Sequence, residues 1–202
     1  MHIKEATYEA DGDYLVDRKG RMRIDVQVDG TRVFTECFDG KTAWEMGSDG
    51  VAKDQSADGA AALWHGTQYP GQILDIAELG RRGHRVEFTG TENVAGADYD
   101  ALRLTMSDGF VTYRYVDQKS HFITRGRDVR AAHPDIDPKK VEIETTWSDF
   151  RAVDGVMRPF LSTETNLNNG QWIQTATVKS VRRLRGIPDR LFIKGAAAEK
   201  LP

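Results

Sequence analysis

The sequence of 202 residues contains one cysteine, Cys37, so it forms no internal disulfide bond. None of its five histidines has a second histidine at the spacing of a typical metal site. It also has no Gly-x-Ser-x-Gly elbow and no His-Glu-x-x-His helix. The sequence therefore predicts no catalytic residue, no metal ion and no cofactor.

An excess of positive charge and long apolar runs are also missing. The formal net charge is −3, which gives no general attraction to nucleic acid. The one basic run, "VRRLRG" (181–186), lacks interleaved aromatics and is interpreted as the solvated end of a strand. No apolar run approaches the roughly 20 residues of a membrane helix, and no signal-peptide pattern opens the chain. We expect no nucleic-acid partner and no membrane-spanning segment.

The stretch "CFDGKTAWEM" (37–46) contains two competing signals. The letters "GKT" at 40–42 match the end of a phosphate-binding loop, whereas Asp39-Gly40 is typical of a hairpin turn. A phosphate loop needs another glycine five residues before Gly40, and that position is Thr35. The residues after the lysine also alternate between apolar and polar, as a strand does. We therefore predict a hairpin turn here and no nucleotide site.

Asp-Gly pairs, which tolerate the positive φ that tight hairpin turns require, recur along the chain. They occur at 11–12, 29–30, 39–40, 49–50, 58–59, 108–109 and 154–155, with Asn-Gly at 169–170. The segments between them alternate apolar and polar side chains at period two. About ten strands are expected, and so many should curl. We predict a mainly β protein built on one curved antiparallel sheet.

Residues 57–82 interrupt this alternation and are predicted to form two short helices. Asp58 could cap the first, which should end before Pro70, and the second should stop at Gly80. An amphipathic insert between strands needs an apolar surface to cover, and the concave face of the sheet is the candidate.

Several segments carry a family resemblance in their order and spacing. They are "FDGKTAWEM" (38–46), "GHRVEFTGTENVAGADYDALRLTMSDGFVTYRYVD" (83–117), "TTWSDFRAVDGVMRPF" (145–160) and "IPDRLFIK" (187–194). The chain resembles the outer-membrane lipoprotein-sorting-protein-like family, relatives of the periplasmic lipoprotein carrier LolA. The resemblance implies a half-open β-barrel with helices over a hydrophobic concave face, in the periplasm or cell envelope. One domain is expected over 1–194, followed by a flexible tail at 195–202.

The functional hypothesis is non-enzymatic binding or transport of a hydrophobic ligand, such as a lipid or the acyl chains of a lipoprotein. The lining residues predicted from strand alternation are Met22, Ile24, Val26, Trp44, Met46, Leu102, Leu104, Met106, Ile143 and Trp147. Those predicted from the helical insert are Leu63, Trp64, Ile73, Leu74 and Leu79. Because alternation does not say which face is which, a shift of one residue would move a whole strand's set to the other side.

Two other functions stay open at this point. An envelope interaction module would dock a protein partner through a sheet edge or its convex face, and its concave face would be only a core. A small hydrolase-like enzyme would need polar residues that converge within the cavity. The sequence shows no such set.

Overall fold

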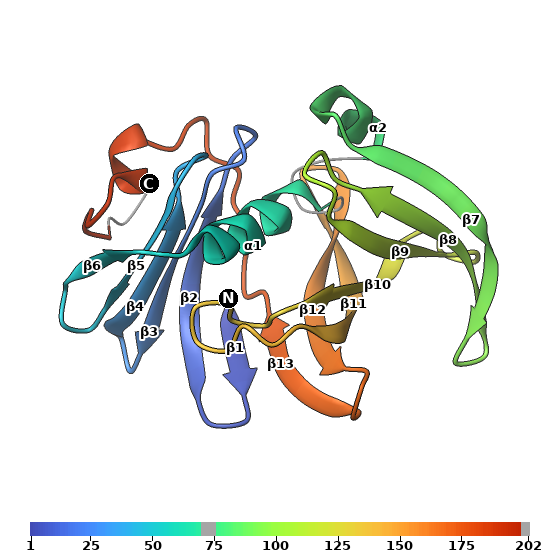
Figure 1. The fold of residues 1–202 in the computed structure, drawn as a ribbon, viewed down its shortest axis with the longest axis horizontal. Helices are drawn as coiled ribbons and strands as arrows, with labels where there is room; N and C mark the ends of the chain where they lie inside the picture. Colours follow the sequence, from blue (N-terminus) through green and yellow to red (C-terminus); the bar gives the residue numbers. More distant parts are fainter. Residues whose placement is uncertain (70–75, 199–202) are drawn as a thin grey trace.

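The computed structural model describes residues 1–69 and 76–198. Within them, strands form a single thirteen-stranded antiparallel sheet, where the sequence predicted about ten (Figure 1). The strands are β1 (His2–Glu5), β2 (Glu9–Val16), β3 (Met22–Val28), β4 (Thr31–Phe38), β5 (Ala43–Gly47), β6 (Ala52–Asp54), β7 (Arg85–Val94), β8 (Ala97–Thr105), β9 (Val111–Asp117), β10 (Ile123–Arg130), β11 (Val141–Val153), β12 (Val156–Asn166) and β13 (Gln171–Thr177).

The order of the strands explains the shape of the molecule. It runs β6-β5-β4-β3-β2-β1-β13-β12-β11-β10-β9-β8-β7. Strands β1–β6 form a first meander and β7–β13 a second, and the two join where β1 pairs with β13. Strands β6 and β7 are consecutive in the chain but lie at opposite edges of the sheet. The chain between them must therefore cross the whole sheet. We call the face that it crosses the inner face, and the opposite one the outer face.

The crossing segment contains the helices α1 (Ala57–Gln68) and α2 (Ile76–Leu79) and the 3₁₀ turn η1 (Gly80–Arg82). Figure 1 shows α1 running from the β5–β6 edge toward the strands of the second meander. The first predicted helix is confirmed and ends before Pro70, but its N-cap is Ser56, whose side chain accepts from the Gly59 amide, and not Asp58. The predicted lining residues Ile73 and Leu74 lie outside the described residues.

Most of the predicted turns are confirmed. Asp29-Gly30 and Asp154-Gly155 both have positive φ at both positions, as tight hairpins between twisted strands require. At Asp39 the carboxylate accepts the next amides along the turn, and β4 pairs with β5 on either side. The hairpin reading of "CFDGKTAWEM" is correct.

One Asp-Gly turn prediction is wrong, because residues 11–12 lie inside β2. Residues 58–59 lie inside α1, in the segment that was predicted to be helical. At Gly12 the backbone pairs with Met1 on one side and faces Val26 of β3 on the other. The ladder partners on both sides keep the chain extended through a dipeptide that elsewhere favours a turn.

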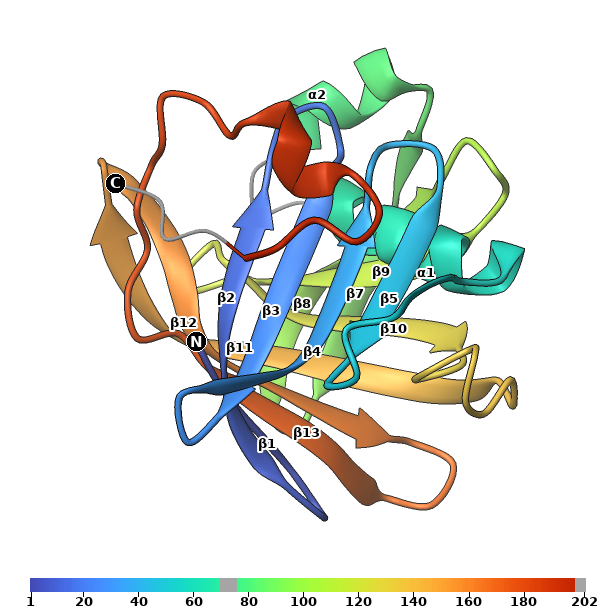
Figure 2. The ribbon, with the colours of Figure 1, turned by 90° about the vertical axis from the view of Figure 1, so that its left-hand side faces the viewer.

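The C-terminal segment covers the outer face of β3–β5, on the side opposite α1 (Figure 2). It contains the 3₁₀ turn η2 (Asp189–Phe192), whose Phe192 packs on Cys37, Trp44 and Met46. The Trp44 indole donates to the carbonyl of Phe192 at 3.2 Å. Within the tail predicted at 195–202, Arg23 donates to the carbonyl of Ala196 at 3.0 Å, and residues 199–202 lie outside the described range.

Candidate functional site

The inner face beneath α1 is apolar. In the first meander, Met22, Phe38 and Ala43 form a buried cluster. Packed against it are Tyr14, Val16, Ile24, Ala60, Leu63 and Trp64. In the second meander, Leu79, Leu104 and Met106 form another, with Trp64, Tyr69, Val86 and Phe110 around it. Trp64 belongs to both clusters, so this one side chain of α1 bridges the two halves of the floor.

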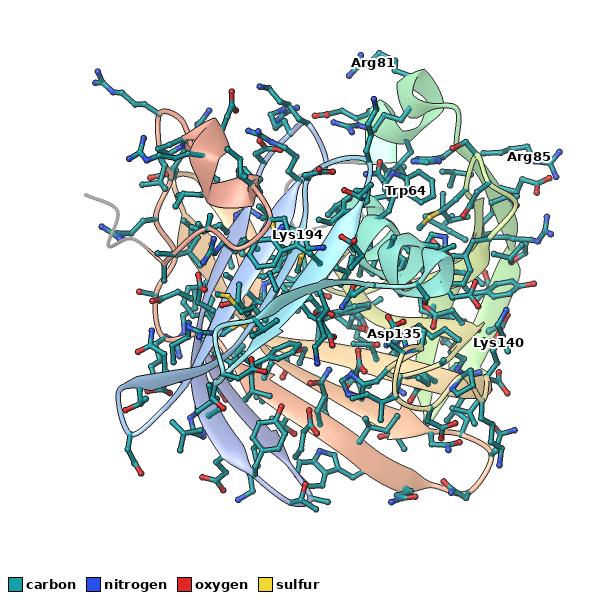
Figure 3. The ribbon with its side chains drawn as sticks, turned by 60° about the vertical axis from the view of Figure 1, so that its left-hand side comes forward. Trp64, Arg81, Arg85, Asp135, Lys140 and Lys194 are labelled. Carbon is teal, nitrogen blue, oxygen red and sulfur yellow. The ribbon has the colours of Figure 1, made fainter. Side chains whose placement is uncertain are left out.

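Polar contacts hold α1 at its N-terminal end. The loop 131–140, between β10 and β11, brings Asp135 to the start of the helix, where its carboxylate accepts from the Ser56 amide at 3.0 Å. Figure 3 shows Asp135 close to α1. The carboxylate also lies close to Gly59, where a Cβ would be 2.1 Å from it. This contact therefore joins the N-terminal end of α1 to the loop between β10 and β11.

The C-terminal end of α1 is tied to the second meander. His65 lies 2.7 Å from the Asp108 carboxylate and stacks on Phe110. Gln68 meets the buried His84, whose Nδ1 accepts from the Ser107 amide, so its Nε2 carries the proton and donates to Gln68. Burial, with the nearby guanidinium of Arg82, lowers the pKa of His84 and keeps the ring neutral. These contacts are few and polar, while the underside of α1 is apolar.

Beyond α1, the inner face becomes polar and charged. The guanidinium of Arg114, in β9, is buried between the rings of Tyr69 at 4.2 Å and Trp147 at 5.4 Å. It donates to the Thr112 hydroxyl at 2.6 Å, while its Nε has no hydrogen-bond partner. The Tyr69 hydroxyl, at the C-cap of α1, donates to Asp128 at 3.2 Å. Burial lowers the pKa of Arg114.

Arg130 completes this polar patch. It donates to Asp128 at 3.0 Å and to Glu164 at 2.8 Å, and Thr145 also reaches Glu164. Burial alone would lower the pKa of Arg130, but the two carboxylates outweigh it and raise that pKa. The family resemblance implied a hydrophobic concave face, and on β9–β12 this face also carries charged side chains beside the apolar Ile143 and Trp147. A signal was present, because residues 123–130 ("ITRGRDVR") carry no apolar alternation.

A third inner-face feature is the carboxyl of Glu36, which lies opposite Glu45 in the β4–β5 pair. Gln55 donates to Glu36 at 2.6 Å. Burial raises the pKa of Glu36, and the hydrogen bond from Gln55 only partly offsets this.

The raised pKa of Glu36 predicts how one substitution changes stability with pH. A carboxyl whose folded pKa is raised holds its proton more tightly in the folded state, so stability falls as the pH rises from the ordinary glutamate value, about 4.3, through the folded pKa. Glu36→Gln removes this loss and keeps an acceptor for Gln55. We expect it to raise the free energy of unfolding at neutral pH and to give no gain below about pH 4.3.

Urea titrations at neutral and acid pH would check this, with the exposed Glu142→Gln as the control for a change of charge alone. Equal gains from Glu36→Gln at both pH values would contradict the buried-carboxyl explanation.

The structure brings together most of the predicted lining residues. Met22, Ile24, Leu63, Trp64, Leu79, Leu104 and Met106 all pack in the two clusters around α1. Val26, Leu102, Ile143 and Trp147 share the inner face of their strands by alternation and register. Of these, Leu102 faces Arg114 and Ile143 faces Asp128 across neighbouring strands, so they border the polar patch.

Trp44 and Met46 are placed differently from the prediction. They oppose Cys37 and Thr35 across β4, and Cys37 in turn opposes Arg23 of β3. The alternation within β5 was read correctly, but its register against β4 turns this apolar pair to the outer face. There the C-terminal segment buries it, a contact between residues too far apart in sequence for a local pattern to show.

Two surface hollows are lined by described residues outside α1. One, of about 260 Å³, is bordered by the β5–β6 hairpin, including Phe34, Val51 and Lys53. Another, of about 510 Å³, lies between Asp154 and residues 183–185. In the described part of the chain, no group of histidine, cysteine or carboxylate side chains is arranged to hold a metal ion. No described helix has the length and apolar character needed to cross a bilayer.

Comparison with known proteins shows which solved structures share this fold. No family model matches the chain, and no curated protein matches its sequence. A LolA superfamily protein from Nitrosomonas europaea, NE2245, superposes with a TM-score of 0.60 at 14% identity, covering 96% of this chain and 86% of that one. The chain has the LolA-like fold. An outer membrane lipoprotein-sorting protein domain from Vibrio parahaemolyticus gives a TM-score of 0.58 at 14% identity, covering 95% of this chain and 86% of that one.

A DUF1329 family protein from Desulfovibrio piger also superposes on the chain, with a TM-score of 0.58 at 14% identity over 95% of this chain and 85% of that one. The half-open barrel expected from the sequence resemblance is confirmed, because the sheet has two free edges and carries short helices on one face. At this level of identity, the likeness concerns the fold.

Proposed function

We propose that the protein binds the acyl chain of a lipid or lipoprotein on its inner face, in exchange for α1. The observation that carries this is the position of Trp64 and Leu63, which cover an apolar floor from a helix held at its ends by polar contacts. Lifting α1 would expose that floor, and each Å² of apolar area is worth about 25 cal/mol. An acyl chain in the same place would restore the burial.

The fold supports the setting of this activity. The similar structures include a LolA superfamily protein and a lipoprotein-sorting domain, so we infer a non-enzymatic binding role in the cell envelope. The polar patch around Arg114 and Arg130 has its carboxylates paired with arginine. This pairing makes the patch a structural element beside the apolar floor.

The hydrogen bond between Asp135 and the start of α1 offers a direct test of this proposal. Replacing it with alanine removes the acceptor for the Ser56 amide, worth about 1 kcal/mol, so α1 should lift more easily. We expect Asp135→Ala to bind a fatty acid about fivefold more tightly than the wild type. The matched control is Asp137→Ala in the same loop, because Asp137 accepts from the Lys139 amide and has no such bond to α1.

Binding would be followed by native mass spectrometry and by quenching of tryptophan fluorescence with a brominated fatty acid. Trp64→Phe should remove much of the quenching, whereas Trp172→Phe should not, because Trp172 donates to Thr175 away from α1. If neither the wild type nor Asp135→Ala binds an acyl chain, the proposed function is wrong. If both bind equally, the cargo does not replace α1.

A second function, docking of a partner chain, has one observation in its favour. Strand β7 ends the sheet, is ten residues long and carries Phe88 with 64% of its surface exposed. A terminal strand of this length can pair with an added strand. Absence of acyl binding, combined with loss of a captured partner on changing Phe88 to lysine, would favour this role.

A further inference from the structure

One end of the molecule gathers three segments that are remote in sequence. They are the β2–β3 turn (17–21), the α2–η1 segment (76–82) and the start of the C-terminal segment (181–190). In Figures 1 and 2 all three lie along the same end, at the top of each view. We call this end the basic rim.

Contacts join the three segments. Arg82 donates to the carbonyl of Arg18 at 2.6 Å, which ties η1 to the β2–β3 turn. Arg21 donates to Asp189 at 2.7 Å, which ties the same turn to η2. The segments therefore form one continuous surface.

The rim is rich in cationic side chains. Its basic residues are Arg18, Lys19, Arg21, Arg81, Arg82, Arg182, Arg183, Arg185 and Arg190. Figure 3 shows Arg81 pointing outward from η1. The whole chain has a formal charge of −3, so the residues outside the rim carry a net negative charge. Positive charge is therefore concentrated at the rim. The rim's acidic side chains are Asp17, Glu78 and Asp189. Asp17 and Asp189 pair with Arg21, and Glu78 pairs with Arg18.

Part of this charge lies outside regular secondary structure. The basic run 181–186 was expected at a strand end, but β13 stops at Thr177 and the run is exposed irregular chain. Arg183 and Arg185 stand on it as exposed side chains. The rim also exposes apolar side chains, Val181 at 40% in the same run and Ile76 of α2 at 39%. Cationic side chains with scattered apolar ones suit the polar interface of a membrane.

We propose that the basic rim docks the protein on a bilayer that contains anionic phospholipid. Charge complementarity selects this partner, because each lysine or arginine near an anionic surface contributes to binding and the acidic remainder of the protein is turned away from it. The rim also carries α2, whose Leu79 belongs to the floor cluster under Trp64. Docking would therefore set this end of the inner face against the membrane. The inference goes beyond acyl binding and does not depend on it.

Vesicle flotation without any cargo tests the proposal. We expect the wild type to float with vesicles of phosphatidylglycerol and phosphatidylcholine. With vesicles of phosphatidylcholine alone it should stay in the bottom fraction. Binding to the anionic vesicles should weaken as the salt concentration is raised. Removing one charge should cost about fivefold in affinity, so Arg183→Gln with Arg185→Gln should weaken binding about 25-fold. Adding Arg81→Gln to this double variant should weaken vesicle binding about fivefold further.

The matched control replaces Lys139 and Lys140 with glutamine, another exposed basic pair in irregular chain but away from the rim, as Figure 3 shows for Lys140. It should float like the wild type. Equal losses in the rim and control variants, or no binding to anionic vesicles by the wild type, would overturn the proposal. Asp135→Ala should not change flotation, which keeps this result separate from a failure of acyl binding.

Discussion

Replacing Arg23 with alanine should lower the free energy of unfolding by about 3–5 kcal/mol. Arg23 is fully buried and pairs with Asp25 through two bonds of 2.7 and 2.8 Å. It also donates to the carbonyls of Leu191 and Ala196. The substitution leaves Asp25 buried with only the Thr35 hydroxyl as a side-chain donor. A charge without its counter-charge in a dry interior is among the most damaging single changes.

The same substitution should loosen the C-terminal segment. Both carbonyls that Arg23 holds belong to that segment, so we expect faster hydrogen exchange at 189–196 together with the loss of stability. Arg151→Ala is the matched control, because Arg151 makes the same two-bond pair with a carboxylate two residues away, at Asp149, but on the surface. It should change stability little. Equal losses in the two variants would show that burial is not what matters at Arg23.

Gly126→Ala should destabilise the protein by about 1–3 kcal/mol. Gly126 lies opposite Arg114 in β9, and a Cβ there would be 2.4 Å from Arg114 Nη1 and 2.9 Å from Trp147 Cη2. An arginine end on the surface would simply move aside. Here the guanidinium is buried, bonded to Thr112 and stacked on Tyr69, so the indole and the guanidinium must both shift.

Gly66→Ala provides the contrast, because Gly66 lies in α1 and a Cβ there would meet no atom within 4 Å. Alanine is favoured over glycine in a helix by about 1 kcal/mol, so this variant should be more stable than the wild type. Denaturant unfolding of both variants, with a check that the transition is two-state, measures the difference. A neutral Gly126→Ala would mean that the polar patch repacks freely.

Local sequence patterns correctly predicted features that depend on interactions between residues close in sequence, namely turns, a helix end and the grouping of side chains along a strand. The turns at Asp29 and Asp154 follow from residues that accept positive φ, and the end of α1 before Pro70 follows from the restriction that a proline places on the residue before it. Strand alternation also grouped Met22 with Ile24 and Leu104 with Met106 correctly.

The same patterns could not place the polar and outer-face residues. Alternation in β5 put Trp44 and Met46 together, but their side of the sheet depends on register with β4 and on cover from Phe192. Arg114 and Asp128 look like solvated strand residues in the sequence. They are buried because Tyr69, from the crossing segment, packs over them.

The sequence by itself determined that this protein is a curved antiparallel meander with a helical insert, because turn chemistry and side-chain periodicity act over a few residues. The insert was also predicted to cover the concave face, but only the tertiary structure decided how it crosses that face. Pairing of β1 with β13 joins the two meanders in the middle of the sheet and leaves β6 and β7 at its two edges. The connection between them then has to span the inner face, and so α1 covers the floor on which we propose that an acyl chain binds.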